Sequence, residues 1–215
     1  MKKLGLYLMT SLIVLTGCEK WYTTDDVSHA SYLPKFNLTG GAFISIRKSD
    51  TAEFVDPGVT AESNGESLTV YYSGNVVDSV VGVYLITYYA TNSDGLKATA
   101  ERIVAVTEYD VSSNDLSGTY NTSVFGELVS SKVKRIDTAG YYESDDVMGY
   151  PGFKMPGHFV DIGNSQLVLL HGAGYFGKYD GSEGTYSRST LSWTLTLLDE
   201  PYQGTVITLT WRKSE

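Results

Sequence analysis

Short segments in which apolar and polar residues alternate are the feature that most limits what this chain can fold into. Within residues 82–91 one alternating set is expected to face a core, namely Tyr84, Ile86, Tyr88 and Ala90. Side chains of an extended strand point alternately to opposite faces, so a period of two predicts strands with one buried face. No segment shows a helical period. We therefore predict an all-β fold.

Turn residues separate the predicted strands. Clusters of Pro, Gly, Asn and Asp at 56–58, 64–65 and 92–95 divide segments that are rich in β-branched and aromatic residues. Near the C-terminus, the turn at 199–204 joins two alternating segments. This pattern predicts a long hairpin with one buried face.

A polar stretch around Ser112 divides the chain into two strand-rich halves. Such stretches between periodic segments are typical of domain boundaries. We predict one β-domain at 31–110 and a second at 115–215, the latter an antiparallel β-sandwich or a barrel-like domain.

The first residues have the pattern of an export signal. Two lysines precede an apolar run at 4–15, which is too short to span a bilayer comfortably. The sequence LTGC at 15–18 resembles a bacterial lipobox. This resemblance implies removal of the signal peptide 1–17 and acylation of Cys18. The alternatives are an ordinary signal peptide or a short buried helix with an incidental cysteine.

Cys18 is the single cysteine of the chain, so neither an internal disulfide nor a Cys-type zinc site is expected. Several acyl chains on one cysteine anchor a protein stably, whereas one chain anchors it only marginally. Residues 18–30 are polar and without period, which predicts a flexible tether. Their early acidic residues resemble surface-export signals of outer-membrane lipoproteins. We expect a lipid-anchored protein of the outer membrane that faces the exterior.

The acidic composition limits the partners. Removing the two lysines of the signal peptide from the 16 Lys and Arg residues leaves 14, against 25 Asp and Glu. This balance repels phosphate backbones, and no basic run with interleaved aromatics is present, so we expect no nucleic-acid partner.

Three motifs in the first half resemble the bacterial immunoglobulin-like (Ig-like) repeat of cell-surface proteins. They are FVDPGVTA at 54–61, VGVYLITYYATNSDG at 81–95 and ERIVAV at 101–106, although Asn92 stands where the family often has Asp. The resemblance covers residues 31–108. It implies that the N-terminal domain is an Ig-like β-sandwich, a fold suited to spacers.

The second half resembles a C-terminal domain that accompanies such Ig-like modules in lipoproteins of gut anaerobes. The segments that carry this resemblance are DLSGTY at 115–120, GYYESDDVMGYPGF at 140–153, GTYSRSTLSW at 184–193 and TVITLTW at 205–211. Genes for these proteins often lie near starch-utilisation-like (Sus-like) uptake systems. The resemblance implies a β-domain connected with glycan capture and supplies no catalytic residues.

Motifs that suggest catalysis are incomplete. Residues 172–177 match G-x-G-x-x-G, but another turn cluster follows instead of a helix, so a glycine-rich hairpin loop is the preferred interpretation. The loop that begins at His171 has no G-x-S-x-G nucleophile motif to accompany it. His29, His158 and His171 lack the spacing of a zinc site. We expect no metal, no cofactor and no enzymatic activity.

Aromatic and acidic residues share the Gly/Pro-rich segment 140–157. Its prolines and glycines disfavour a buried regular strand, so rings on an exposed loop are expected. Exposed rings can stack against the C–H faces of sugars, while carboxylates bind the hydroxyls. The candidate ligand-binding residues are Tyr141, Tyr142, Asp145, Asp146, Tyr150 and Phe153. Packing of these rings in the core and a plain acidic turn are the alternatives.

Together these features favour a lipid-anchored, non-catalytic surface protein that helps to capture polysaccharide through its C-terminal domain. A structural spacer or assembly partner of an outer-membrane transporter complex is the first alternative. An unrecognised glycoside hydrolase is the second, because the separation of two carboxylates cannot be read from a sequence.

Overall fold

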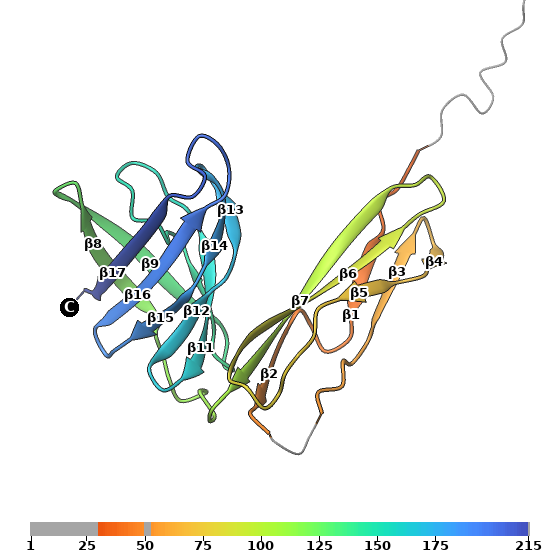
Figure 1. The fold of residues 1–215 in the computed structure, drawn as a ribbon, viewed down its shortest axis with the longest axis horizontal. Helices are drawn as coiled ribbons and strands as arrows, with labels where there is room; N and C mark the ends of the chain where they lie inside the picture. Colours follow the sequence, from red (N-terminus) through yellow and green to blue (C-terminus); the bar gives the residue numbers. More distant parts are fainter. Residues whose placement is uncertain (1–29, 50–52, 215) are drawn as a thin grey trace, which may run out of the picture. The chain divides into compact units, whose positions relative to one another are not determined.

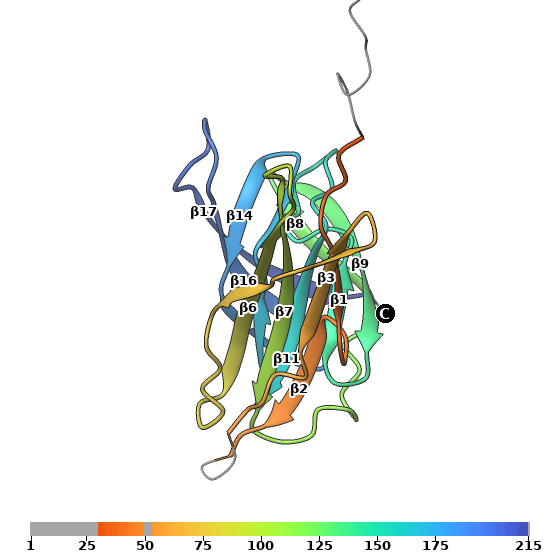
Figure 2. The same cartoon turned by 90° about the vertical axis from the view of Figure 1, so that its right-hand side faces the viewer.

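The computed structural model describes residues 30–49 and 53–214, and every regular element in this part of the chain is a β-strand (Figures 1 and 2). The predicted all-β fold is therefore confirmed. The signal peptide 1–17, Cys18 and nearly all of the predicted tether lie outside the described residues.

Two sheets form the N-terminal sandwich. The smaller sheet has the order β1-β3-β4, and the larger has the order β2-β7-β6-β5 with β2 parallel to β7. The smaller sheet contains β1 (Lys35–Leu38), β3 (Val59–Ser63) and β4 (Glu66–Leu68). The larger contains β2 (Phe43–Arg47), β5 (Tyr71–Ser73), β6 (Gly82–Thr91) and β7 (Lys97–Thr107).

The core of this sandwich follows the predicted alternation. Ile86, Tyr88 and Ala90 on β6 are buried, and Ile86 and Tyr88 pack with Val104 of β7. The intervening β6 residues point to the other face of the larger sheet, where Val83 contributes to a different cluster. The period of two in the sequence therefore separates two distinct contact faces.

A buried arginine fixes the turn before β3. Arg102 is fully buried, and its Nη1 donates to Asp56 Oδ1 at 2.7 Å. Its Nη2 donates to the carbonyls of Thr39 and Gly58 at 2.7 and 3.1 Å. The Tyr88 hydroxyl also donates to Asp56. Removing one partner of such a pair would leave a buried charge uncompensated, so this group ties both sheets together.

The second half forms one antiparallel sheet that closes into a barrel. Neighbouring strands follow the order β16-β15-β12-β11-β10-β9-β8-β17, and the additional β16–β17 pairing closes the ring. The hairpin β13–β14 extends from β16. The strands are β8 (Gly118–Val124), β9 (Glu127–Asp137), β10 (Tyr141–Ser144), β11 (Gly157–Gly163), β12 (Gln166–Leu169), β13 (Gly172–Gly174), β14 (Gly177–Gly181), β15 (Glu183–Tyr186), β16 (Thr190–Leu197) and β17 (Val206–Lys213).

Large side chains fill the barrel. Trp193 and Trp211 are its largest buried residues, and Tyr142 stacks on Phe159 with 5.1 Å between ring centroids. The predicted long hairpin with one buried face is confirmed, since β16 pairs with β17 and buries the alternating residues Leu191, Trp193, Leu195 and Leu197. An eight-stranded barrel has an interior just wide enough for side chains to fill, as here.

The segment 178–184, which the sequence predicts as a turn cluster, is mostly strand. β14 and β15 both pair with β16, and Ser182 between them donates to the Thr194 carbonyl at 2.9 Å. A Cβ atom on Gly181 or Gly184 would lie 2.1 Å from a neighbouring backbone oxygen. These glycines therefore allow close strand packing and do not mark turns.

A third hydrophobic cluster joins the sandwich to the barrel. Ala105 of β7 is buried together with Val160 and Ile162 of β11. Phe43 stacks on Tyr141 with 4.8 Å between centroids. Residues 32–215 accordingly form one compact unit.

Candidate aromatic ligand-binding surface

Four loops gather at one end of the barrel. Because successive barrel strands run in opposite directions, every second connection lies at the same end. The connections at this end span 125–126, 145–156 and 198–205, and the segment 170–176, which contains the short strand β13, lies with them. Closure of the barrel therefore brings together loops that are far apart in the sequence.

Six aromatic rings from these loops contact one another, and we call them the aromatic surface. They are Phe125, Tyr150, Phe153, Tyr175, Phe176 and Tyr202. Phe176 is the hub, with ring centroids 5.1 Å from Tyr150, 5.1 Å from Tyr175 and 5.5 Å from Tyr202. Phe125 meets Tyr150 edge-on at 5.8 Å. Each of the four loops thus contributes at least one ring.

Most of these rings face solvent. Phe125 is 83% exposed, Tyr175 67%, Tyr202 45% and Phe153 39%. Tyr150 and Phe176 are partly buried and pack against the barrel core, so they support the outer rings from below. Contiguous exposed apolar surface on a soluble protein commonly marks a binding site.

Phe125 has a backbone conformation that its side chain does not favour. Phe125 and Gly126 form a two-residue hairpin loop with φ of 52° and 81°, while Val124 pairs with Glu127. Two positive φ values are typical of a type I′ turn, for which Asn-Gly is preferred. A bulky residue with positive φ is an outlier, and such strain is concentrated at functional sites. Packing does not explain Phe125, because the ring is mostly exposed.

A buried carboxylate shapes the loop that carries Tyr150 and Phe153. Asp146 Oδ1 accepts backbone N–H groups of Met148, Gly149 and Met155 at 3.0, 3.1 and 3.3 Å. Its Oδ2 is buried without a hydrogen-bond partner. Burial raises the pKa of Asp146 above its ordinary value of 3.8, although the three N–H donors act in the opposite direction. Asp146 therefore closes the loop from inside.

Charged groups lie beside the rings. Lys154 forms an ion pair with Asp145, and both side chains are partly exposed. Asp199 Oδ2 accepts the backbone N–H of Lys178 at 2.9 Å, which connects the 198–205 loop to the start of β14. Both oxygens of Asp145 are engaged, because Oδ1 accepts the backbone N–H of Lys132 at 2.7 Å and Oδ2 binds Lys154. Among the described residues, Asp199 Oδ1 has no hydrogen-bond partner, so Asp199 is the carboxylate more open to a ligand.

The structure brings together only part of the predicted ligand-binding set. Tyr150 and Phe153 belong to the aromatic surface, and Asp145 lies on the same loop. Tyr142 and Asp146 are fully buried, which corrects the expectation that they contact a ligand. Tyr141 lies between Phe43 and His158, to which it stacks at 4.8 and 5.3 Å, on the joint with the sandwich.

The burial of Tyr142 has a physical reason. Its hydroxyl donates to the Asn114 carbonyl at 2.9 Å and its ring stacks on Phe159 inside the barrel. Tyr141 and Tyr142 belong to β10, which ends at Ser144, so the Gly/Pro-rich loop begins only after them. Adjacent strand residues face opposite sides, and hence neither ring lies on the loop.

The ligand-binding residues predicted from the sequence do not include Phe125, Tyr175, Phe176 and Tyr202. Each is an aromatic residue in a turn that also contains glycine: Phe125 precedes Gly126, and Gly174 and Gly177 flank Tyr175 and Phe176. Turns favour Gly, Asn, Asp and Pro, so aromatic residues there are a signal for function. That signal was available in the sequence.

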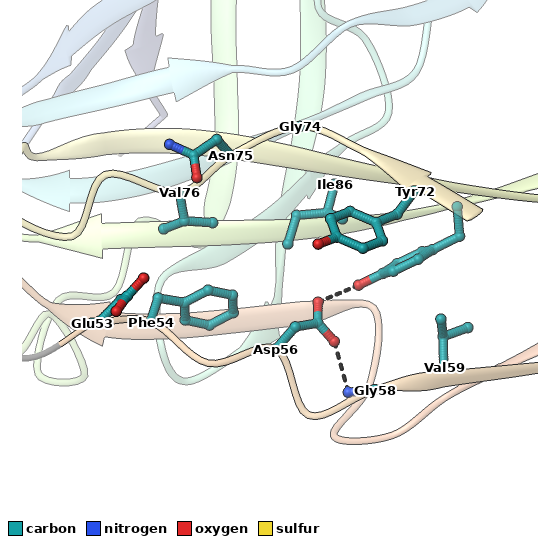
Figure 3. A pocket seen from close by; sticks show the side chains of 11 residues that line it. Glu53, Phe54, Asp56, Gly58, Val59, Tyr72, Gly74, Asn75, Val76 and Ile86 are labelled. Carbon is teal, nitrogen blue, oxygen red and sulfur yellow. Dashed lines mark hydrogen bonds between the residues drawn. The ribbon is translucent and has the colours of Figure 1, made fainter. Parts of the chain in front are cut away.

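The sandwich contains a separate cavity of about 380 Å³ (Figure 3). Its lining includes Phe54, Tyr72, Ile86 and the carboxylate of Asp56. Asp56 already accepts hydrogen bonds from Arg102, from the Tyr88 hydroxyl and from the Gly58 N–H. Its oxygens are therefore already used in hydrogen bonds that stabilise the sandwich, and we assign no ligand to this cavity.

Across residues 30–49 and 53–214, no three His, Cys, Asp or Glu side chains are grouped so that they could hold a metal ion. The same residues include no helix that is long and apolar enough to cross a bilayer.

Comparison with known proteins identifies the sandwich. Residues 36–106 match the family described as bacterial surface protein, Ig-like domain. The predicted Ig-like fold of the N-terminal domain is thereby confirmed. No curated protein sequence matches the chain.

Two solved structures are similar at low TM-scores. One is a lipoprotein from Bacteroides thetaiotaomicron, with a TM-score of 0.36 and 23% identity over 84% of this chain and 100% of the other. The other, from Clostridium perfringens ZmpB, contains CBM51-2 in complex with GlcNAc and INT domains. It has a TM-score of 0.30 and 19% identity, and the match covers 75% of this chain but only 29% of the other. Similarities this weak carry no information on function.

The Phe125→Asn variant should be more stable than the wild type. Asparagine tolerates positive φ, so relief of backbone strain should exceed the loss of the edge contact with Tyr150 and give a gain of about 0.5–1 kcal/mol. Urea unfolding measures the difference. The control is Leu128→Asn, which replaces a 74% exposed residue on the neighbouring strand β9. A similar gain in both variants, or a loss in Phe125→Asn, would contradict the strain assignment.

The Asp146→Asn variant should show a flatter dependence of stability on pH. The folded-state pKa of Asp146 lies above its ordinary value of 3.8, so wild-type stability falls as pH rises from that value through the folded-state pKa. Asparagine keeps the acceptor for the three N–H groups and cannot ionise. Urea unfolding at pH 4 and pH 7 should therefore show that the variant gains stability relative to wild type at the higher pH. Parallel pH profiles would contradict this assignment.

Proposed function

We propose that the chain is a lipid-anchored protein of the bacterial cell surface that captures polysaccharide through the aromatic surface of its barrel and performs no catalysis. The Ig-like family match supports a bacterial surface protein. The observation that carries the proposal is the contiguous set of six rings on four loops at one end of the barrel.

The chemistry of this surface suits sugars. A pyranose presents C–H groups on its faces, which pack against aromatic rings, and hydroxyls at its edges, which need hydrogen-bond partners. Tyr175 and Tyr202 combine an apolar ring with a polar hydroxyl, a type of residue enriched where one side of a contact is wet. Asp199 supplies a carboxylate oxygen on the 198–205 loop, and Asp145 and Lys154 form an ion pair on the 145–156 loop.

A spacer or assembly role is the second candidate, and a different observation favours it. The buried cluster around Ala105, Val160 and Ile162 joins sandwich and barrel. A buried apolar joint restricts relative motion of the parts it connects, whereas a polar joint permits it. A rigid connection is what a spacer needs, and it is also compatible with capture by the barrel loops.

Replacement of two outer rings should abolish polysaccharide binding. The fragment 19–215 contains every described strand and is suited to a panel of soluble and insoluble polysaccharides. The variant Phe153→Ala/Tyr175→Ala should lose all binding detectable for the wild type. Its melting temperature should fall little, because both rings are exposed, whereas truncating a core aromatic costs about 3–5 kcal/mol.

The matched control is Tyr71→Ala/Tyr72→Ala, which removes two exposed rings from β5 of the sandwich. This variant should bind as the wild type does. Equal losses of polysaccharide binding in both double variants would contradict binding through the barrel loops. If the wild type binds no polysaccharide, the spacer role would be favoured.

Anchoring is tested separately with Cys18→Ser in the full chain. We expect this variant to move from the membrane fraction to the soluble fraction, because serine offers no sulfur for acylation. The measurement is the amount of wild type and variant in the soluble fraction and in salt-washed membranes after cell fractionation. Retention of the variant on washed membranes would contradict the lipid anchor.

A further inference from the structure

We infer that the aromatic surface takes a neutral polysaccharide, which lies across the loops as an extended chain. This inference rests on the proposed function and names the class of ligand. Three observations support this inference. They are the charge of the ring-bearing loops, the free hydroxyls of the aromatic surface, and the extent of that surface.

The loops disfavour an anionic ligand. Glu127, Glu200 and Asp199 are exposed on the ring-bearing connections or directly beside them. Lys154 is already bound to Asp145 in an ion pair. Lys178, at the start of β14 beside Asp199, is a second exposed cation. Asp145, Glu127, Asp199 and Glu200 therefore outnumber Lys154 and Lys178 at this end of the barrel, and uronic or sulfated sugars would approach an excess of carboxylates. The net charge of −9 for the whole chain adds long-range repulsion of anionic polymers.

Neutral hydrogen-bonding groups remain available on the rings. Among the described residues, the hydroxyls of Tyr150, Tyr175 and Tyr202 have no hydrogen-bond partner. A phenolic hydroxyl both donates and accepts, as does a sugar hydroxyl. The Asp199 carboxylate at the margin can accept a further sugar hydroxyl. Rings with free hydroxyls and acceptor groups match a polymer that is rich in hydroxyls and carries no charge.

The surface is wider than one sugar. Successive centroid separations from Phe125 to Tyr150, Phe176 and Tyr202 are 5.8, 5.1 and 5.5 Å. The exposed rings of this series, Phe125 and Tyr202, lie at its two ends, and the partly buried Tyr150 and Phe176 lie between them. A pyranose is about as large as one aromatic ring, so a single sugar cannot reach both ends. A ligand that contacts rings from several loops therefore needs several linked units.

The test measures binding of fragment 19–215 to neutral and anionic polymers and to an oligosaccharide series. Neutral probes are β-glucan, xylan, mannan and galactan, and anionic probes are polygalacturonate and alginate. We expect binding to at least one neutral polymer with little change between 50 and 500 mM NaCl, and none to the anionic probes. Affinity for oligosaccharides of the bound polymer should rise at least about tenfold from one unit to four.

A charge-reversal variant tests whether the acidic residues near the rings exclude anionic polymers. Glu127→Lys/Glu200→Lys changes two exposed carboxylates that are not part of the ring set. It should keep neutral binding within about twofold and gain salt-sensitive binding to polygalacturonate. The control is Glu62→Lys/Glu66→Lys on the sandwich, which should bind no anionic polymer.

The outcomes separate this inference from the proposed function. Preferential, salt-sensitive binding of wild type to an anionic polymer would overturn the inference and leave polysaccharide capture intact. Equal affinity for one and four sugar units would overturn the extended chain. Binding to no polysaccharide would overturn both. Sedimentation could also show that the wild type is a dimer and that Phe153→Ala/Tyr175→Ala is a monomer. The rings would then form an interface with a second copy of the chain, and both proposals would be overturned.

Discussion

Closure of the barrel by β16 is the interaction on which the candidate site depends. This strand pairs with β17 on one side and with both β14 and β15 on the other. Its inward residues, including Trp193, fill the interior and fix the register. An open sheet would leave two free edges and would separate the 125–126 loop from the 198–205 loop. The ring of strands thus makes one surface from four distant segments.

Two features of the loops at this end each carry a local energetic cost. Phe125 has positive φ at the tip of its hairpin, and Asp146 has a buried oxygen without a partner. Each feature opposes folding, yet each positions aromatic side chains. Proteins commonly accept such local costs where function requires a defined geometry. The rest of the barrel offsets them, because its packed aromatic interior is continuous beneath the loops.

Sandwich and barrel are stabilised differently, although both are all-β. The sandwich combines an apolar core with a buried ion pair, in which Arg102 connects Asp56 to the carbonyls of Thr39 and Gly58. The barrel depends on large apolar and aromatic side chains. Where they meet, apolar contacts around Val160 dominate, and the exposed His171–Glu101 pair at 3.1 Å contributes little by comparison. Apolar burial, and not charge, therefore holds the two parts together.

The sequence by itself determined the fold class, the burial of alternating residues on β6 and β16, and the Ig-like character of the first domain. The first two follow from local rules, since the period of two and the turn residues act within a few positions. The Ig-like character follows from the motifs at 54–61, 81–95 and 101–106, which resemble the bacterial Ig-like repeat. Only the tertiary structure decided which rings share a surface. Tyr141 and Tyr142 lie next to the ring-bearing loop in sequence but point into the joint and the barrel. Phe125 and Tyr202 are distant in sequence but join Tyr150 and Phe176, because strand pairing around a closed barrel is a non-local interaction that local patterns cannot encode.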